Sequence, residues 1–181
     1  SRLALQSDAD GKPTELRFES LSFFVIERGG RLAIRLKDTE AAALKNFVGL
    51  DYFSISAKHR IVGRFEPYNP PKEILVPSVI GTLDKEISPG TVAFDWQGQT
   101  YRFEVIGKPE DGELFFVFAD KSNGQETYGA GRFLYAKGPD ANQNVELDFN
   151  KAYNPVCAFT PYATCPLPPK KYSPIPRVSP L

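Results

Sequence analysis

Short segments in which apolar and polar residues alternate recur along this 181-residue chain, and they constrain its fold more than any other feature. In Arg31–Lys37, Leu32, Ile34 and Leu36 fall on one face of an extended strand, while the cationic residues fall on the other. A period of two residues is typical of a half-buried β-strand. The sequence therefore predicts an all-β protein.

Turn residues separate the expected strands at short, regular intervals. Gly29-Gly30 and Gln97-Gly98 each lie between two such segments, as the tight turns of β-hairpins do. The pattern favours an antiparallel sandwich or partly open barrel with at least eight strands. The expected strands are Leu21–Glu27, Arg31–Lys37, Arg60–Glu66, Val92–Trp96, Tyr101–Val105, Leu114–Phe118, Arg132–Tyr135 and Val145–Phe149.

One short helix is expected over Thr39–Phe47, because Asp38 or Thr39 can cap its first turn and three alanines follow. Half of the sixteen prolines fall within residues 155–181. Proline has no N–H to donate to a strand ladder, so the regular sheet should end near Phe149. The length of the chain indicates a single domain over residues 1–181, with a strand-rich body at 14–149, an ordered Pro-rich coil at 150–169 and a tail at 170–181.

The segment Asp148–Pro169 is the best candidate for a functional site. It contains both cysteines, five prolines and several aromatic residues, yet it has neither helical nor strand periodicity. We interpret it as an ordered coil held by its own bulky side chains. Irregular segments on a rigid scaffold often carry binding or catalytic groups.

Asp148 ends the last expected strand, where it points away from the apolar face of Val145, Leu147 and Phe149. One hypothesis makes Asp148 the floor of a pocket, as a base or ligand anchor. The alternative is that Asp148 and Asn150 hold the backbone of the coil in shape, as Asx turns do. We expect Arg132 to pair with Asp148 or Glu66, because arginine is well shaped to bind a carboxylate and sequential strands usually pair.

A pocket near the coil would be lined by flat tyrosine rings and oriented by small polar or charged groups. Arg64 and Glu66 lie on one face of their strand and could form an ion pair across the mouth of the barrel. The expected ligand-binding residues are Arg64, Glu66, Tyr68, Tyr128, Arg132, Asp148, Asn150, Tyr153, Asn154 and Tyr162.

The two cysteines, Cys157 and Cys165, lie eight positions apart. They could form a local disulfide or remain as two buried thiols. Their spacing is not that of a zinc knuckle, and His59 is the single histidine that could join them. We expect no metal and no cofactor, and we expect His59 at the surface or rim.

Composition excludes some classes of partner. The net charge is zero and no basic stripe is present, so nucleic acid is not expected as a partner. No apolar run approaches the roughly 18 residues of a membrane helix, so no transmembrane segment is expected. Because the sequence contains no methionine, even at position 1, we expect a removed N-terminal segment. The compartment, cytoplasmic or exported, and the oligomeric state stay open.

Several strings resemble the hallmark segments of the prokaryotic domain of unknown function family 1684. They are RFEPYNPPKEILVP, NGQETYGAGRFLY and DFNKAYNPVCAFTPYATCPLPP, with SLSFFVIERGGRLAIRLKD and NFVGLDYF similar as well. The resemblance covers about Lys12 to Pro169. It implies a bacterial or archaeal, strand-rich domain and implies no activity.

Three functions are compatible with these patterns. The first is a module that binds a small, neutral or mildly anionic ligand in the pocket near the coil. The second is a hydrolase in which Asp148 or Glu66 is the general base and Arg132 stabilises developing negative charge. The third is a structural or partner-binding domain without a pocket. Whether the protein is an enzyme stays open at this point.

Overall fold

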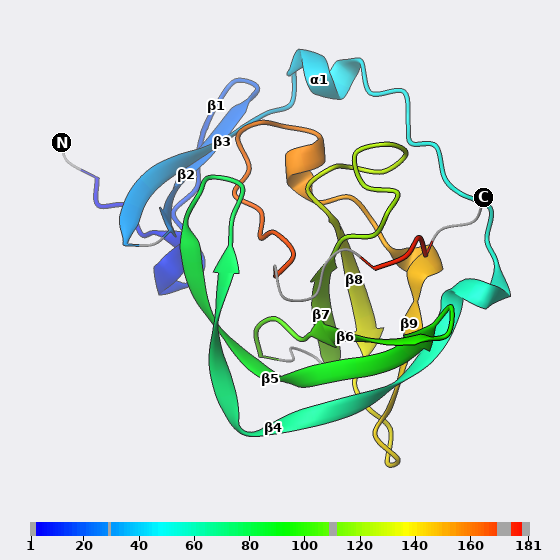
Figure 1. Cartoon of the computed structure of the whole chain (residues 1–181). Helices are drawn as coiled ribbons and strands as arrows, with labels where there is room; N and C mark the ends of the chain where they lie inside the picture. Colours follow the sequence, from blue (N-terminus) through cyan, green and yellow to red (C-terminus); the bar gives the residue numbers. More distant parts are fainter. Residues whose placement is uncertain (1–2, 29, 109–111, 170–174, 179–181) are drawn as a thin grey trace. The chain divides into compact units, whose positions relative to one another are not determined.

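We describe the fold from a computed structural model, which covers residues 3–28, 30–108, 112–169 and 175–178 (Figure 1). The chain forms two compact units, Ser1–Leu50 and Asp51–Leu181. The expectation of a single domain stays a prediction. Antiparallel strands dominate both units, so the prediction of an all-β protein with at least eight strands is confirmed.

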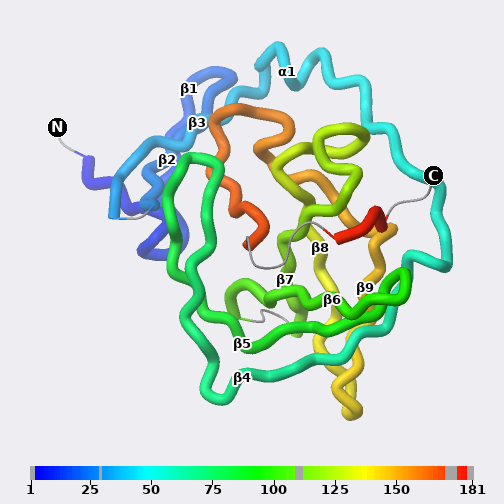
Figure 2. Tube along the Cα trace, viewed as in Figure 1, coloured from blue at the N-terminus to red at the C-terminus, as the bar shows by residue number. Residues whose placement is uncertain are grey.

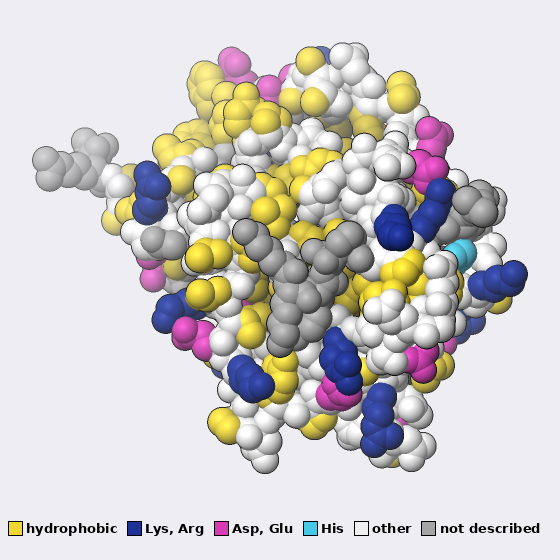
Figure 3. Space-filling view, viewed as in Figure 1, with side chains coloured by type: hydrophobic (Ala, Val, Ile, Leu, Met, Phe, Trp, Pro, Cys, Tyr) yellow, Lys and Arg dark blue, Asp and Glu magenta, His cyan; other side chains and the backbone are white. Residues whose placement is uncertain are grey.

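The first unit is a three-stranded antiparallel sheet in the order β1-β2-β3, formed by Leu16–Phe18, Leu21–Arg28 and Arg31–Asp38. A short 3-10 helix, Asp8–Asp10, precedes the sheet, and the Asp8 carboxylate accepts the Glu27 N–H and pairs with Arg28. Val25 lies opposite Ile34 in the register, but the expectation that β3 is half-buried is wrong, because Leu32, Ile34 and Leu36 are 71%, 68% and 57% exposed. Hydrophobic side chains lie at the surface over these strands in Figure 3.

The expected helix is much shorter than predicted. Helix α1 spans only Ala42–Lys45, and no side chain caps its first turn. The Asp38 carboxylate instead accepts the N–H of Glu40, so residues 38–41 form a turn and the helix begins later. A one-turn helix gains few internal hydrogen bonds for the residues that it orders.

The second unit contains a curled four-stranded sheet in the order β6-β5-β4-β9 and a two-stranded sheet, β7-β8 (Figure 1). The Cα trace in Figure 2 shows how far the β4–β5 hairpin bends around β7 and β8. The strands of the curled sheet are β4 (Arg60–Pro77), β5 (Leu83–Trp96), β6 (Gln99–Glu104) and β9 (Asn144–Asp148). The other pair is β7 (Glu113–Phe118) and β8 (Arg132–Lys137).

Strands β4 and β5 extend well beyond the predicted segments. Four prolines occur in β4, all of them after Glu66, where the predicted strand ended. The register of β4 against β5 shifts between Pro67 and Lys72, so the prolines of this stretch lie at an irregularity. A bulge accommodates residues that have no N–H for the ladder, and it also bends the strand.

The core of the second unit lies between the curled sheet and the β7–β8 pair. Leu114, Phe116 and Phe118 of β7 are fully buried there, and Val145 and Leu147 of β9 point inward as the sequence predicted. Phe149 packs edge-on against Phe103 and Phe118. Three 3-10 turns border this core, Ala57–His59, Phe149–Lys151 and Val156–Ala158.

Gly63 allows β4 and β5 to lie close together at the centre of the curled sheet. A Cβ atom at this position would lie 2.6 Å from Val92 Cγ1 and 2.8 Å from the Ala93 carbonyl oxygen. We therefore expect Gly63→Ala to lower the free energy of unfolding by about 1–3 kcal/mol, the usual effect of overpacking. Urea denaturation followed by tryptophan fluorescence would measure the change.

Gly129→Ala is a matched control. Its new Cβ would lie 3.6 Å from Gly124 Cα, and this distance is an ordinary van der Waals contact. An equal loss of stability in both variants would contradict the packing argument.

Candidate functional site

The structure places the ten predicted site residues in separate groups. Asp148 and Asn150 hold the coil, Arg132 lies in the core, and Tyr128 contacts the cysteine region. Glu66 and Tyr68 belong to the curled sheet. Tyr153 joins a group of aromatic rings that was not predicted from the sequence.

Asp148 and Asn150 anchor the start of the coil. Asp148 Oδ1 accepts from the backbone N–H of Asn150 at 3.2 Å and from its side-chain amide at 2.7 Å. The Asn150 side chain also accepts the Ser56 N–H and donates to the Ser56 carbonyl, both at 3.0 Å. These are the hydrogen bonds that the structural interpretation of the two residues predicts. They tie the coil to a segment 94 positions earlier in the chain.

The predicted pairing of Arg132 with Asp148 or Glu66 is wrong. Arg132 Nη2 donates to Asp120 Oδ2 at 2.8 Å, and both side chains are almost completely buried. The prediction failed because β8 pairs with β7 while β9 pairs with β4, so these two consecutive strands are not hydrogen-bonded neighbours. Burial lowers the pKa of Arg132, against the opposing attraction of Asp120.

Asp120 connects several parts of the second unit. Its carboxylate accepts from the Ser122 N–H and hydroxyl, from Arg132 and from the Val178 N–H. The guanidinium of Arg132 lies 5.1 Å from the Phe118 ring centroid, and its Nε has no hydrogen-bond partner among the described residues. The buried arginine therefore depends on one carboxylate.

Because of this dependence, Asp120→Ala should lower the free energy of unfolding by about 3–5 kcal/mol, the usual cost of leaving one partner of a buried ion pair alone. Chemical denaturation would measure the loss. Glu66→Ala serves as the control, since it breaks a half-exposed ion pair that should contribute less than about 1 kcal/mol. Similar losses in the two variants would refute this ranking.

Glu66 pairs with Arg102 and not with Arg64, which corrects the second predicted pairing. Arg102 Nε donates to Glu66 Oε2 at 2.8 Å and Nη2 donates to Oε1 at 3.1 Å, while Thr91 adds a hydrogen bond. The Arg102 guanidinium holds the pKa of Glu66 below its usual range. A lower pKa makes a carboxylate a weaker base, so this geometry does not favour the hydrolase hypothesis at Glu66.

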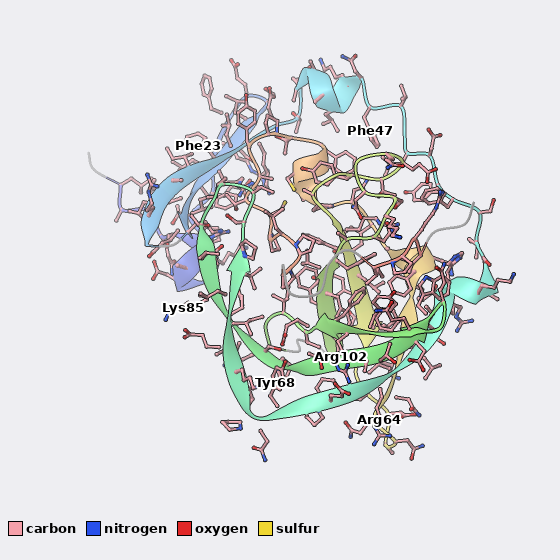
Figure 4. The ribbon with its side chains drawn as sticks, viewed as in Figure 1. Phe23, Phe47, Arg64, Tyr68, Lys85 and Arg102 are labelled. Carbon is pink, nitrogen blue, oxygen red and sulfur yellow. The ribbon has the colours of Figure 1, made fainter. Side chains whose placement is uncertain are left out.

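Tyr68 covers a buried carboxylate in the same sheet. Its hydroxyl donates to Glu104 Oε2 at 3.3 Å, and Ser88 Oγ donates to Glu104 Oε1 at 2.5 Å. The Lys72 ammonium lies 3.8 Å from the centroid of the Tyr68 ring. Arg64 and Tyr68 are residues of β4 and Arg102 is a residue of β6, and Figure 4 shows all three along the curled sheet.

Tyr128 contacts the region of the two cysteines. Its hydroxyl donates to the Cys157 carbonyl oxygen at 3.2 Å, and the Cys157 N–H donates to Cys165 Sγ at 3.2 Å. The pKa of Tyr128 is raised above its ordinary value. The largest cause is hydrogen bonding with the Cys157 side chain, and the next cause is burial. Both cysteines are thiols here, Cys165 buried and Cys157 half-buried.

The expected surface position of His59 is wrong. His59 is buried against Trp96, with ring centroids 5.7 Å apart, and burial lowers its pKa. Within the described part of the chain, no three His, Cys, Asp or Glu side chains form a group that could hold a metal ion. The helices described there include none long and apolar enough to cross a membrane.

Four aromatic rings contact one another on the face of β7 and β8 that is opposite the main core, and we call them the aromatic platform: Phe115, Phe133, Tyr135 and, from the coil, Tyr153. Phe115 and Phe133 are partly buried there against a smaller core cluster of Val76, Ile106 and Val117. The Tyr135 and Tyr153 rings are nearly parallel, with an interplanar angle of 10° and centroids 6.4 Å apart. Phe115 contacts the rings of Phe133 and Tyr135, and Phe133 meets Tyr153 edge-on. Tyr135 and Tyr153 remain 47% and 44% exposed, so the platform presents two tyrosine rings to solvent.

Backbone hydrogen bonds fix the coil to the platform. The Phe133 N–H donates to the Tyr153 carbonyl at 2.9 Å, and the Tyr153 N–H donates to the Phe133 carbonyl at 3.0 Å. Tyr153 thereby continues the aromatic face of β8. Tyr153 was predicted from the sequence and its partners were not, although the spacing of Phe133 and Tyr135 on one face of a strand was a signal for them.

The remaining predicted residues lie in the coil. Tyr162 is 85% exposed, and Asn154 is half-buried directly after Tyr153.

Burial, with a further contribution from Tyr135, raises the pKa of Tyr153 to about 12. The protonated phenol is therefore favoured by folding. Its contribution to stability should be fully present below pH 10, the ordinary pKa, and be lost as the pH rises toward 12. The difference in absorbance at 295 nm between the wild type and Tyr153→Phe, followed against pH, would report this ionisation. A Tyr135→Phe background should lower the value, and an unchanged titration there would contradict the role of Tyr135.

Comparison with known proteins adds a family. The sequence model of the family described as "Protein of unknown function (DUF1684)" matches residues 45–173. The solution NMR structure of an uncharacterized protein from gene locus rrnAC0354 of Haloarcula marismortui matches with a TM-score of 0.58 and 27% sequence identity. The match covers 71% of this chain and 72% of that chain. No curated protein matches.

Proposed function

The chain belongs to the family of proteins of unknown function DUF1684, and from the geometry of its surface we propose that it is a ligand-binding domain that uses the aromatic platform. The observation that carries this proposal is the pair of half-exposed, nearly parallel tyrosine rings of Tyr135 and Tyr153. The ligand would be a small, neutral or mildly anionic molecule with a flat apolar face.

The chemistry of the platform supports this ligand class. A tyrosine ring offers a flat apolar surface together with a hydroxyl that can donate or accept a hydrogen bond. Phe115 and Phe133 brace the two tyrosines from within the same face, so little side-chain freedom remains to be lost on binding. A rigid aromatic surface is therefore prepared to stack against a planar group.

The other predicted residues support the platform from a distance. Asp148 and Asn150 hold the beginning of the coil, and the coil positions Tyr153. In this proposal Arg64, Glu66 and Tyr68 stabilise the curled sheet and do not bind the ligand.

A thermal-shift screen against a metabolite library would test the proposal. A compound that binds only the folded protein stabilises it by about 2.7 kcal/mol at one hundred times its Kd, which raises the melting temperature by several degrees. We expect hits with a planar group, and we expect Tyr135→Ala to weaken them at least tenfold while the protein stays folded. Titration calorimetry would give the change in affinity.

Tyr162→Ala is the matched control, because Tyr162 is a highly exposed tyrosine of the same coil that is not a platform ring, and this proposal, unlike the expectation from the sequence, gives it no part in binding. It should leave the affinity unchanged. If no compound stabilises the wild type more than it stabilises Tyr135→Ala, the platform is not a binding site.

A further inference from the structure

Four residues beyond the family match, Ile175–Val178, are bound to other parts of the second unit, and we call them the C-terminal segment. Ile175 forms a parallel β-bridge with Asp120. The Ile175 N–H donates to the Ala119 carbonyl at 3.2 Å, and the Lys121 N–H donates to the Ile175 carbonyl at 3.1 Å. The backbone of Ile175 is therefore bound to the chain that follows β7 by the two hydrogen bonds of a single β-bridge.

Side chains of the second unit bind two further backbone groups of the segment. The Trp96 indole N–H donates to the Arg177 carbonyl at 3.1 Å. The Val178 N–H donates to Asp120 Oδ2 at 2.9 Å. Arg132 and Ser122 also hold this carboxylate, so its position does not depend on the segment alone.

The side chains of the segment meet three distinct environments. Ile175 and Val178 are each 1% exposed and pack into the main core cluster. Arg177 donates to Glu126 Oε1 at 3.0 Å, makes a second contact with the other oxygen, and lies 5.5 Å from the centroid of the Phe53 ring. The surface thus selects apolar residues at the first and fourth positions and an arginine at the third.

We propose that this surface is a peptide-recognition groove, which the chain's own C-terminal segment fills in the isolated protein. Its occupant in function is a partner segment with the pattern apolar-x-Arg-apolar in extended conformation. Main-chain hydrogen bonds supply affinity in this mode of recognition, and side-chain pockets supply specificity. The preference for arginine is carried by the carboxylate of Glu126, whose charge is complementary to the guanidinium.

The groove uses other residues than the aromatic platform, so the two proposals are independent. The platform lies on the outer face of β7 and β8, whereas the groove is formed by Ala119–Lys121, Trp96 and Glu126. A failure of one proposal leaves the other intact.

Fluorescence anisotropy with a labelled peptide would test the groove on the full chain. The peptide carries the sequence of residues 173–180, Ser-Pro-Ile-Pro-Arg-Val-Ser-Pro. In the wild type the attached segment competes at an effective concentration of about 1 mM, which weakens the binding of added peptide. Val178→Asp places a charge in the apolar site and releases the segment. We expect this variant to bind the peptide at least about tenfold more tightly than the wild type.

Val156→Asp is the matched control, because it makes the same change at a valine that is 61% exposed. It should bind the peptide no better than the wild type. Folded Val178→Asp protein that binds the peptide no better than the wild type would overturn the proposal, since the segment would then be only a part of the core. A dimer of the wild type that exchanges this segment and excludes the peptide would also overturn it.

Charge reversal provides a second test that does not depend on the stability of Val178→Asp. Glu126→Arg changes a half-exposed side chain and should repel the arginine of the peptide. A peptide with glutamate in place of that arginine should then bind the variant at least about fivefold better than the original peptide does. The same order of affinities for both proteins would refute the assigned pocket.

Discussion

The ion pair between Asp120 and Arg132 is the interaction on which much of the second unit depends. Arg132 begins β8 on the face that points into the core, where an unpaired guanidinium would be strongly destabilising. Asp120 supplies the compensating charge and also binds the N–H groups of Ser122 and Val178. One buried carboxylate therefore organises the connection after β7 and holds the C-terminal segment against it.

The two faces of β8 have different roles as a result. Leu134 and Ala136 continue the buried face that Arg132 begins, while Phe133 and Tyr135 point to the outer face. The coil adds Tyr153 to that outer face through two backbone hydrogen bonds. A strand that the core holds rigidly on one side can present a well-ordered aromatic surface on the other, and this order favours binding because less freedom is lost.

The coil, which is rich in aromatic residues and prolines, is ordered without regular secondary structure because polar side chains anchor its backbone. Asp148 and Asn150 satisfy backbone groups at its start, and Tyr128 binds the carbonyl of Cys157 farther along. Each anchor comes from a polar side chain that meets a backbone group. The curled sheet also contains prolines within an ordered backbone. A register shift accommodates prolines of β4 that a regular ladder would exclude.

The strand class and the alternation of side chains along each strand could be predicted from the sequence, because a period of two is a local property of the chain, but alternation did not predict that Leu32, Ile34 and Leu36 of β3 would be exposed. The sequence predicted the inward face of Val145 and Leu147 and the role of Asp148 and Asn150, which depends on residues two positions apart. It did not predict that Arg132 would pair with Asp120, that Tyr153 would stack on Tyr135, or that Ile175 would enter the core. Those contacts were decided by the tertiary structure alone, because they depend on which strands become neighbours, and alternation within a strand carries no information about its partner.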